Sequence, residues 1–304
     1  MWFKNCLFYR LSEDLNWDED SLASQLEKQK FSPCGKREPS KYGWVSPLGQ
    51  EHEQLQHWSN GCFMICARKE EKILPAAVIK DKLLEKVQLI EAREDRKVYR
   101  KEQQSMKEDI VHDCLPQAFT RSQRTFAFID TRNHWLYIDA SSHGKAEALI
   151  NLLRETIGSL PLTLPQVQES PAVIMSQWLR AEDVPHDIVL GNECELREFG
   201  EEGSILRCKN QDLLSDEISQ HLDAGKQVVK LALNWQDSVQ MMLGDDLSLK
   251  RLKFSDKLIN EGEEAGDADP IARFDADFSL LSAEFARLTP SLLDWFGGRR
   301  ADPI

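Results

Sequence analysis

The sequence has no run of apolar residues long enough to cross a membrane. A membrane-spanning helix needs roughly 20 consecutive, mostly apolar residues, and no stretch of the 304 residues approaches that length. The first residues, Met1 to Cys6, also lack the separate basic region and the small-residue cleavage site of a secretory signal. We therefore expect a protein that stays in the cytoplasm and has no membrane partner.

Motifs of nucleotide-driven and nucleophilic enzymes are missing as well. The sequence contains no phosphate-binding loop of the form Gly-x-x-x-x-Gly-Lys-Ser/Thr, no glycine fingerprint for a dinucleotide and no Gly-x-Ser-x-Gly elbow. The seven histidines are dispersed, and none has a serine or cysteine partner in a recognisable local motif. This pattern predicts a protein that is not an enzyme.

The seven cysteines are an odd and scattered set in a chain far larger than a disulfide-stabilised fold. Cys62 and Cys66 invite a zinc assignment because His52 and His57 lie nearby in the sequence. Residues 61–67 have the composition of a strand, which would separate the two Cα atoms by about 13 Å. That distance is too wide for two ligands of one tetrahedral zinc ion, so we expect structural thiols and no metal.

Positive charge is scarce overall. The chain has 38 Lys and Arg against 51 Asp and Glu, for a formal net charge of −13. Nucleic-acid-binding proteins are usually basic, and a uniformly acidic surface would repel phosphate. Binding to a polyanion is therefore compatible with this sequence only if the cations are gathered on one part of the surface.

The first half of the sequence alternates strand and helix patterns. Between Pro75 and Pro116 nothing breaks a helix, so this interval of about forty residues is one helix or a pair, up to ~50–60 Å long. The other expected elements are strands at 2–11, 61–67, 125–130 and 135–140, and helices at 18–29 and 145–157.

The second half begins after a proline-rich stretch that includes Pro161, Pro165 and Pro171, the best candidate for a domain boundary. Here we expect a strand at 172–179, an antiparallel meander formed by 227–235, 238–243 and 247–254, an exposed loop at 260–270 and a helix from about Phe278. The predicted fold is α+β, with antiparallel sheets and helices. The expected domains are residues 1–164, with a long helical projection at about 76–117, and residues 165–304, which contain the meander.

The cations of the predicted helical segment fall on one side of an ideal helical wheel drawn for residues 78–113. Residues 80–107 contain nine Lys and Arg against six Asp and Glu, a balance of +3 that leaves −16 for the rest of the chain. From Lys82 to Lys107 an unbroken helix would be about 37 Å long, comparable to one turn of B-DNA. The predicted DNA-binding residues of this segment are Lys82, Lys86, Arg93, Arg96, Lys97, Arg100, Lys101 and Lys107. The alternative is an ordinary solvated helix stabilised by Glu/Lys pairs, and periodicity alone leaves both open.

Other cations occur where contacts with a phosphate backbone are plausible. They are Arg121 and Arg124 after Pro116, and Lys250, Arg251 and Lys253 on the last strand of the meander. The competing explanation is that Lys and Arg on strands protect a sheet edge. Helix-turn-helix spacing, zinc fingers and an aromatic RNA-binding signature are all missing, so reading of base sequence is unsupported.

Two groups of aspartates could hold Mg²⁺ and support a nuclease. Asp275 and Asp277 resemble a fragment of a two-metal site, and Asp245 could join them. The simpler interpretation is that Asp245 and Asp246 form a turn after Gly244. Asp275 and Asp277 would then lie at a helix start.

Several segments together resemble the bacterial recombination-associated protein RdgC family, in order and over nearly the whole chain. They are Trp2–Asn5, Ile65–Pro75, Leu115–Phe119, Gly158–Pro161, Ala224–Lys226, Lys230–Leu233, Leu249–Phe254 and Arg273–Phe278. The resemblance implies a dimer closed into a ring by head-to-head and tail-to-tail contacts. Its basic hole would admit a DNA duplex, and an acidic exterior would explain the net charge.

The resemblance also implies that the protein binds double-stranded DNA without sequence preference and without a cofactor. It further implies restraint of the RecA recombinase by competition for DNA, and a nucleoid-associated location. Binding to single-stranded DNA stays open, as does inhibition by direct contact with the recombinase. Lys226, in a matching segment, joins the expected DNA-binding residues.

The resemblance assigns Phe119 to ring closure, whereas the residues alone predict an ordinary core aromatic. It places Asn210 and Gln211 at a dimer contact or near DNA. Gln117 and Asn210 depart from the family pattern, since a relative has arginine and lysine there.

Overall fold

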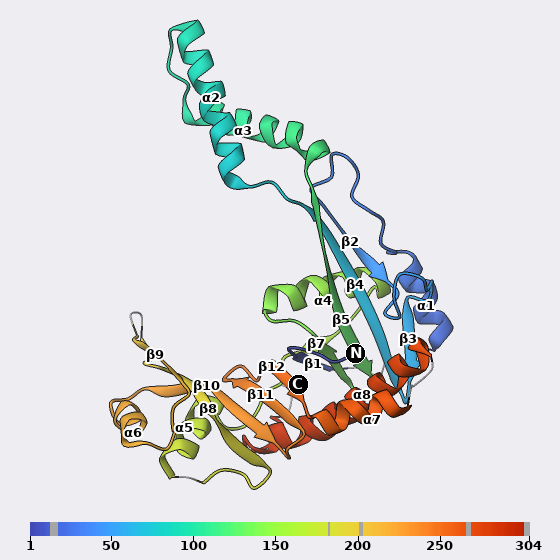
Figure 1. Ribbon diagram of the computed structural model, residues 1–304, viewed down its shortest axis with the longest axis vertical. Helices are drawn as coiled ribbons and strands as arrows, with labels where there is room; N and C mark the ends of the chain where they lie inside the picture. Colours follow the sequence, from blue (N-terminus) through green and yellow to red (C-terminus); the bar gives the residue numbers. More distant parts are fainter. Residues whose placement is uncertain (13–17, 182, 201–202, 266–268, 301–304) are drawn as a thin grey trace.

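The computed structural model describes residues 1–12, 18–181, 183–200, 203–265 and 269–300. In this part of the chain, eight α-helices accompany a seven-stranded and a five-stranded sheet, both antiparallel, so the predicted α+β class with antiparallel sheets is confirmed. Figure 1 shows a C-shaped outline. A helix pair forms one end, two long strands form the back, and the five-stranded sheet forms the other end.

The seven-stranded sheet has the order β2-β4-β5-β6-β1-β7, and β3 pairs with β4. Its strands are β1 Leu7–Leu11, β2 Ser40–Val45, β3 Gln56–Ser59, β4 Cys62–Lys72, β5 Thr120–Asp130, β6 Trp135–Ile138 and β7 Leu162–Thr163. β4 and β5 pair without a break from Cys62 opposite Asp130 to Lys72 opposite Thr120. The strands expected at 61–67, 125–130 and 135–140 are confirmed, and β4 and β5 extend beyond the first two.

Two helices cover one face of this sheet, α1 Glu19–Glu27 and α4 His143–Ile157. α1 begins at Asp18, whose carboxylate accepts from the backbone N–H of Ser21 at 2.7 Å. The Nε1–H of the fully buried Trp44 donates to Thr156 of α4 at 2.8 Å, so the burial of this indole leaves no unpaired donor. The two helices expected in this half are confirmed.

The five-stranded sheet has the order β12-β11-β10-β8-β9. Its strands are β8 Ile188–Arg197, β9 Ile205–Lys209, β10 Gln227–Trp235, β11 Val239–Gly244 and β12 Leu249–Phe254, and the helices after β7 are α5 Pro171–Ala181, α6 Asp216–Asp223, α7 Asp256–Ala265 and α8 Pro270–Asp294. The predicted meander is present as β10, β11 and β12. None of the helices in the described ranges is both long and apolar enough to cross a membrane.

One hydrophobic core joins the two sheets. The ring of Phe285 on α8 lies 5.0 to 5.8 Å from those of Phe128 and Tyr137, which belong to the seven-stranded sheet. The same cluster contains Leu231 and Leu249 of the five-stranded sheet. The chain before β1 crosses between the sheets, since Cys6 exchanges backbone hydrogen bonds of 2.7 and 3.0 Å with Leu249. This core therefore includes residues on both sides of the expected boundary near 164.

The segment expected as a helical projection at 76–117 contains two helices, α2 Ala76–Glu94 and α3 Arg100–Cys114, followed by a 3-10 turn, η1 Leu115–Gln117. α2 ends where Asp95 adopts a left-handed conformation with φ of 49°. Aspartate tolerates this region better than most residues. The connection then folds back along α2, because Val98 packs with Val87 and Met106 in a small separate core. The single helical wheel drawn through residues 78–113 is therefore wrong.

Three expectations for the second half are corrected. Residues 172–179 form α5 and not a strand; Ser170 and Pro171 are a typical helix start, and Ala172, Met175 and Leu179 are buried at helical spacing. Residues 260–265 of the expected loop belong to α7, while 266–268 lie outside the described residues. The last helix begins eight residues early, at Pro270, capped by the Asp269 carboxylate accepting from the N–H of Ile271.

The shared core predicts a large cost for truncating Phe285, whose side chain is buried among aromatic rings from both sheets. We expect Phe285→Ala to lower the free energy of unfolding by about 3–5 kcal/mol, measured by urea denaturation. The matched control is Phe199→Ala, whose ring is exposed, with an expected change within about 0.5 kcal/mol. Equal stability of the two variants would contradict a core shared by the sheets.

Candidate nucleic-acid interface

The five-stranded sheet has one buried and one open face. Leu231, Leu233 and Trp235 of β10 point into the core, against α5 and α8. The alternating residues Lys230, Ala232 and Asn234 point to the other face, where no helix of the described part of the chain covers them. Residues opposite Lys230, Ala232 and Asn234 in the neighbouring strands share that face. We call it the open face.

The open face is strongly basic. The five strands carry seven Lys and Arg against two acidic residues, Glu193 and Glu195, within a chain whose net charge is −13. The seven cations are Arg197, Arg207, Lys209, Lys230, Lys250, Arg251 and Lys253. Three of them, Lys250, Arg251 and Lys253, were expected from the sequence. The other four were not identified from the sequence. Arg207 and Lys209 alternate along β9, and this spacing is a sequence signal by which an exposed strand face could have been recognised.

Glu195 organises the cations at the β9 side of the open face. Its buried carboxylate accepts from Arg207 at 2.9 Å and from Lys230 at 3.0 Å, and Arg197 lies 3.7 Å away. Burial acts to raise the pKa of Glu195, but the hydrogen bonds from Arg207 and Lys230 outweigh it and the pKa is lowered. One carboxylate thus holds three cations in place without neutralising them.

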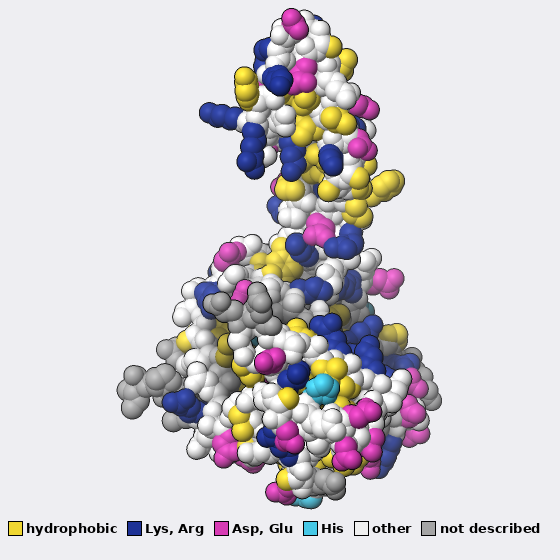
Figure 2. Space-filling model, turned by 90° about the vertical axis from the view of Figure 1, so that its left-hand side faces the viewer, with side chains coloured by type: hydrophobic (Ala, Val, Ile, Leu, Met, Phe, Trp, Pro, Cys, Tyr) yellow, Lys and Arg dark blue, Asp and Glu magenta, His cyan; other side chains and the backbone are white. Residues whose placement is uncertain are grey.

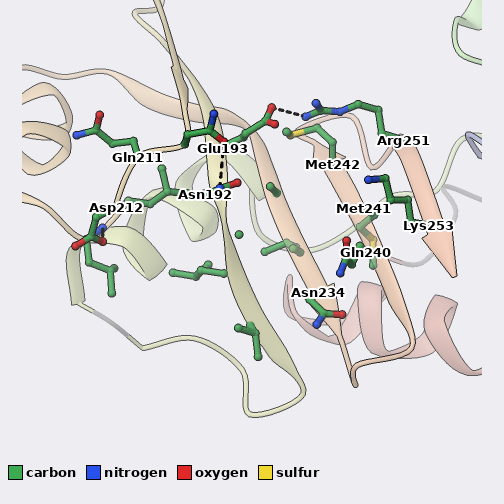
Figure 3. A pocket seen from close by; sticks show the side chains of 18 residues that line it. Asn192, Glu193, Gln211, Asp212, Asn234, Gln240, Met241, Met242, Arg251 and Lys253 are labelled. Carbon is green, nitrogen blue, oxygen red and sulfur yellow. Dashed lines mark hydrogen bonds and ion pairs between the residues drawn. The ribbon is translucent and has the colours of Figure 1, made fainter. Parts of the chain in front are cut away.

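The rest of the open face is hollowed. A depression of about 850 Å³ extends from β8 across β10 and β11 to β12. Arg251 and Lys253 lie on its β12 side, and Gln211 lies beyond β8 on the other side (Figure 3). Asn210, the neighbour of Gln211 in the sequence, also lines the depression. The structure therefore brings four of the expected residues around one depression. Two of them were expected to bind DNA, and two were expected at a dimer contact or near DNA.

The polar side chains of this hollow are held by local contacts. Arg251 donates to Glu193 at 2.8 Å, and its φ of 53° marks an irregularity in the pairing of β11 with β12. Asn192 donates to Asn210 at 3.3 Å, and Gln211 donates to Glu217 at 2.9 Å. Carboxamides and cations around an apolar floor are suited to contacts with phosphate and sugar oxygens.

The cations of the helix pair do not form one continuous row. Lys82, Lys86 and Arg93 belong to α2, whereas Arg100, Lys101 and Lys107 belong to α3, and Arg96 and Lys97 lie in the connection. Arg93 and Arg96 both donate to Glu94.

Arg96 is the most strongly paired cation of this group. It makes a two-pronged ion pair with Glu102 at 2.7 and 2.8 Å, and the hydrogen bonds that it donates to Glu102 and Glu94 raise its pKa above the ordinary value. Five others, Lys82, Lys97, Arg100, Lys101 and Lys107, are exposed and form no ion pair with a residue in the described ranges. The helix pair therefore offers a smaller set of available cations than the sequence predicted.

On the concave side of the C-shaped molecule, Lys and Arg side chains gather in two places (Figure 2). One group lies on the helix pair, among a few Asp and Glu side chains, and a second lies on the lower body, above an edge where Asp and Glu side chains are frequent. The concave side of the molecule therefore presents basic surfaces at both of its ends.

The remaining expected residues are dispersed. Arg121 is exposed and paired with Glu71, whereas Arg124 is half-buried opposite Arg68 in the pairing of β5 with β4. Lys226 lies in the turn before β10, outside the hollow. Phe119, just before β5 at the base of the helix pair, is 85% exposed, so the core position expected from the residues alone is wrong.

The three aspartates of the nuclease hypothesis do not form one cluster. Asp275 accepts from His57 of β3 at 2.8 Å, Asp277 pairs with the amino group of Met1, and Asp245 lies in the turn between β11 and β12. Asp275 and Asp277 lie inside α8, not at its start. Within the described ranges, no three His, Cys, Asp or Glu residues are grouped to hold a metal ion. Cys62 and Cys66 are free and buried, as expected.

Comparison with known proteins places this arrangement in a family. A family model described as "Putative exonuclease, RdgC" matches residues 1–299. A recombination-associated protein RdgC from Tolumonas auensis is 48% identical over 99% of this chain and 100% of its own length. Proteins of the same name from Psychromonas ingrahamii and Yersinia enterocolitica are 47% and 45% identical, over 99% and 98% of this chain and 100% and 98% of their own lengths.

The position of Glu195 predicts an acid-sensitive contribution to stability. Because its pKa is lowered in the folded protein, this contribution is present at neutral pH and is lost as the pH falls through the folded-state pKa. We expect Glu195→Gln to lower the free energy of unfolding at pH 7 by about 1–2 kcal/mol. The variant should also lose less stability than the unmodified protein between about pH 5 and pH 3.

Thermal unfolding at several pH values measures both effects. The control is Glu155→Gln, an exposed glutamate of α4, for which we expect an unchanged pH profile. If Glu195→Gln has the same profile as the unmodified protein, Glu195 does not hold the three cations.

Proposed function

This chain belongs to the RdgC family, and on that premise we propose that it binds double-stranded DNA through the phosphate backbone, without reading base sequence. The observation that carries the proposal is the segregation of charge. The strands of the open face carry seven cations against two carboxylates in a chain of net charge −13. Phosphates near this face would be attracted, while the acidic residues elsewhere are screened beyond about 8–10 Å at physiological salt.

We also propose that two copies form a ring around the duplex. Each copy would supply half of the ring, since one chain is C-shaped with basic surfaces on its concave side (Figures 1 and 2). Both ends of the C carry exposed apolar side chains, which monomeric proteins rarely gather in groups. At the helix-pair end they are Val78, Leu84, Leu89, Tyr99 and Phe119, and at the other end they are Val189, Ile205 and Leu214.

Phe119 is the proposed anchor of the first contact. An exposed phenylalanine at a fixed position, its backbone oxygen accepting from Ile73 at 2.8 Å, suits insertion into a pocket of a partner. Asn210 and Gln211 beside the hollow would contribute to the second contact or to DNA binding.

In the cell, such a ring would limit recombination by competition. A protein that occupies the duplex excludes the RecA recombinase from the same lattice without needing a specific contact with it. The curated relatives are named for an association with recombination. The proposed location is therefore the nucleoid, and single-stranded DNA is a second ligand to be tested.

A nuclease is the second candidate function, and the description of the family model favours it. It would require carboxylates placed around Mg²⁺, and Asp245, Asp275 and Asp277 do not meet in the structure. A third candidate is direct inhibition of the recombinase by protein contact, with the helix pair as an ordinary solvated surface.

Titration of a labelled duplex with salt tests the main proposal. If six to ten phosphates are contacted, affinity should fall ~10³–10⁵-fold between about 50 and 200 mM salt. Lys209→Ala with Lys253→Ala should reduce the slope of log affinity against log salt by about two. The duplex should remain intact with Mg²⁺ or Mn²⁺; shortened strands would support the nuclease instead.

The matched control is Lys28→Ala with Lys257→Ala, which removes two exposed lysines from α1 and α7 regions away from the open face. We expect this pair to leave the slope unchanged. A flat salt titration, or equal slopes for the two double variants, would contradict phosphate binding by the open face.

Phe119→Ala tests the closed dimer separately. If Phe119 is an interface anchor, its truncation should weaken association by about 2–4 kcal/mol, measured by sedimentation at low protein concentration. Exposed Phe199→Ala is the control. A normally folded Phe119→Ala variant with unchanged dimer mass would reject the anchor.

A further inference from the structure

Two cysteines face each other across neighbouring strands. Cys194 of β8 lies directly opposite Cys208 of β9 in the antiparallel register. Both belong to the seven free cysteines of the chain. Neither residue has a role in the proposed DNA-binding surface, because the pair lies on the covered face of the sheet. Cys194 is also opposite Leu231, which points into the core.

The backbone geometry suits a disulfide. Directly opposed residues of an antiparallel pair have Cα atoms about 4.5–5.5 Å apart, and disulfides bridge Cα atoms about 4.4–6.8 Å apart. The two thiols are near neighbours, since Cys208 contributes to raising the pKa of Cys194. Cys62 and Cys66, by contrast, follow one another along a single strand, where their Cα atoms are about 13 Å apart.

The two thiols differ in access to solvent. Cys194 is 3% exposed, and burial together with the neighbouring Cys208 raises its pKa to about 12. Cys208 is only half-buried and lies on β9, the edge strand of the sheet. An oxidant from solvent therefore reaches Cys208 first, and the adjacent Cys194 is positioned to complete the reaction.

We propose that Cys194 and Cys208 form a reversible disulfide when the folded protein meets hydrogen peroxide. The sulfur of Cys208 attacks one peroxide oxygen, the O–O bond breaks, and a sulfenic acid and one water result. The sulfur of Cys194 then attacks the sulfur of Cys208, the S–O bond breaks, and a second water leaves with the thiol proton. One peroxide is reduced to two waters while two thiols become one disulfide, and a dithiol reductant reverses the change.

The disulfide would fasten β9 to β8. Among the residues that the structure describes, this edge strand pairs with a neighbour on one side only. Arg207 and Lys209 lie on the opposite face of β9 from Cys208, because side chains alternate along a strand. Oxidation would thus fix two cations of the open face without covering them, and the site exists whether or not that face binds DNA.

Peptide mapping of the full-length protein tests the proposal. The reduced, folded protein is treated with hydrogen peroxide, free thiols are alkylated, and the digest is analysed by mass spectrometry without reduction. We expect a linked peptide joining Cys194 and Cys208 that has lost two hydrogens and that disappears after treatment with dithiothreitol. Backbone amides of β9 should exchange hydrogen more slowly in the oxidised protein than in the reduced protein.

Cys208→Ser should abolish the linked peptide, whereas Cys34→Ser, which removes another half-buried thiol, should retain it. Formation of the link only after unfolding in urea would overturn the proposal. Oxidation of Cys208 in the folded protein without any link to Cys194 would overturn it too. DNA binding is not part of this readout, so failure of the site leaves the proposed function untouched.

Discussion

Alternation of side chains along β8 to β12 is the constraint on which the proposed interface depends. Apolar residues such as Leu231, Leu233 and Trp235 occupy every second position of β10 and are buried with α5 and α8. The residues between them must then point away from the core, on the side that carries Lys230 and the cations of the neighbouring strands. A one-residue shift in register would exchange the two sets. Burial of the apolar face therefore fixes the position of the cations, and Glu195 holds three of them at defined sites.

The shared core converts this local arrangement into a feature of the whole molecule. Phe285 packs against aromatic rings of the seven-stranded sheet, and Cys6 pairs with Leu249 of the five-stranded sheet. These contacts hold the two sheets in one orientation, so the long strands β4 and β5 carry the helix pair to the opposite end of the C (Figure 1). Because cations are gathered at both ends of the C, a chain with a net charge of −13 can still attract a polyanionic ligand.

Much of this fold could be predicted from the sequence. Most strands, and α1 and α4, follow from alternation, apolar spacing and end signals. The break at Asp95 was not predictable from the sequence, because neither glycine nor proline marks it. A helical wheel drawn through the break therefore placed cations of α2 and α3 on one side, although they belong to two separate helices. The strand expected at 172–179 shows that an apolar run with Val and Ile is ambiguous when its Ser-Pro start is overlooked. The sequence revealed Lys250, Arg251 and Lys253 as candidate DNA-binding residues because they lie close together in it. Arg207 and Lys230 are far apart in the sequence, and only the folded chain brings them together, around Glu195.

Chemical reactivity of individual lysines tests the central claim most directly. The protein is treated with an acetylating reagent with and without duplex DNA at low salt, and the acetylation of each lysine is measured by mass spectrometry. If the open face contacts the phosphate backbone, DNA should protect Lys209, Lys230, Lys250 and Lys253 while Lys28 and Lys257 stay equally reactive. Unchanged reactivity of the four open-face lysines, in a sample shown to be bound to DNA, would contradict the account.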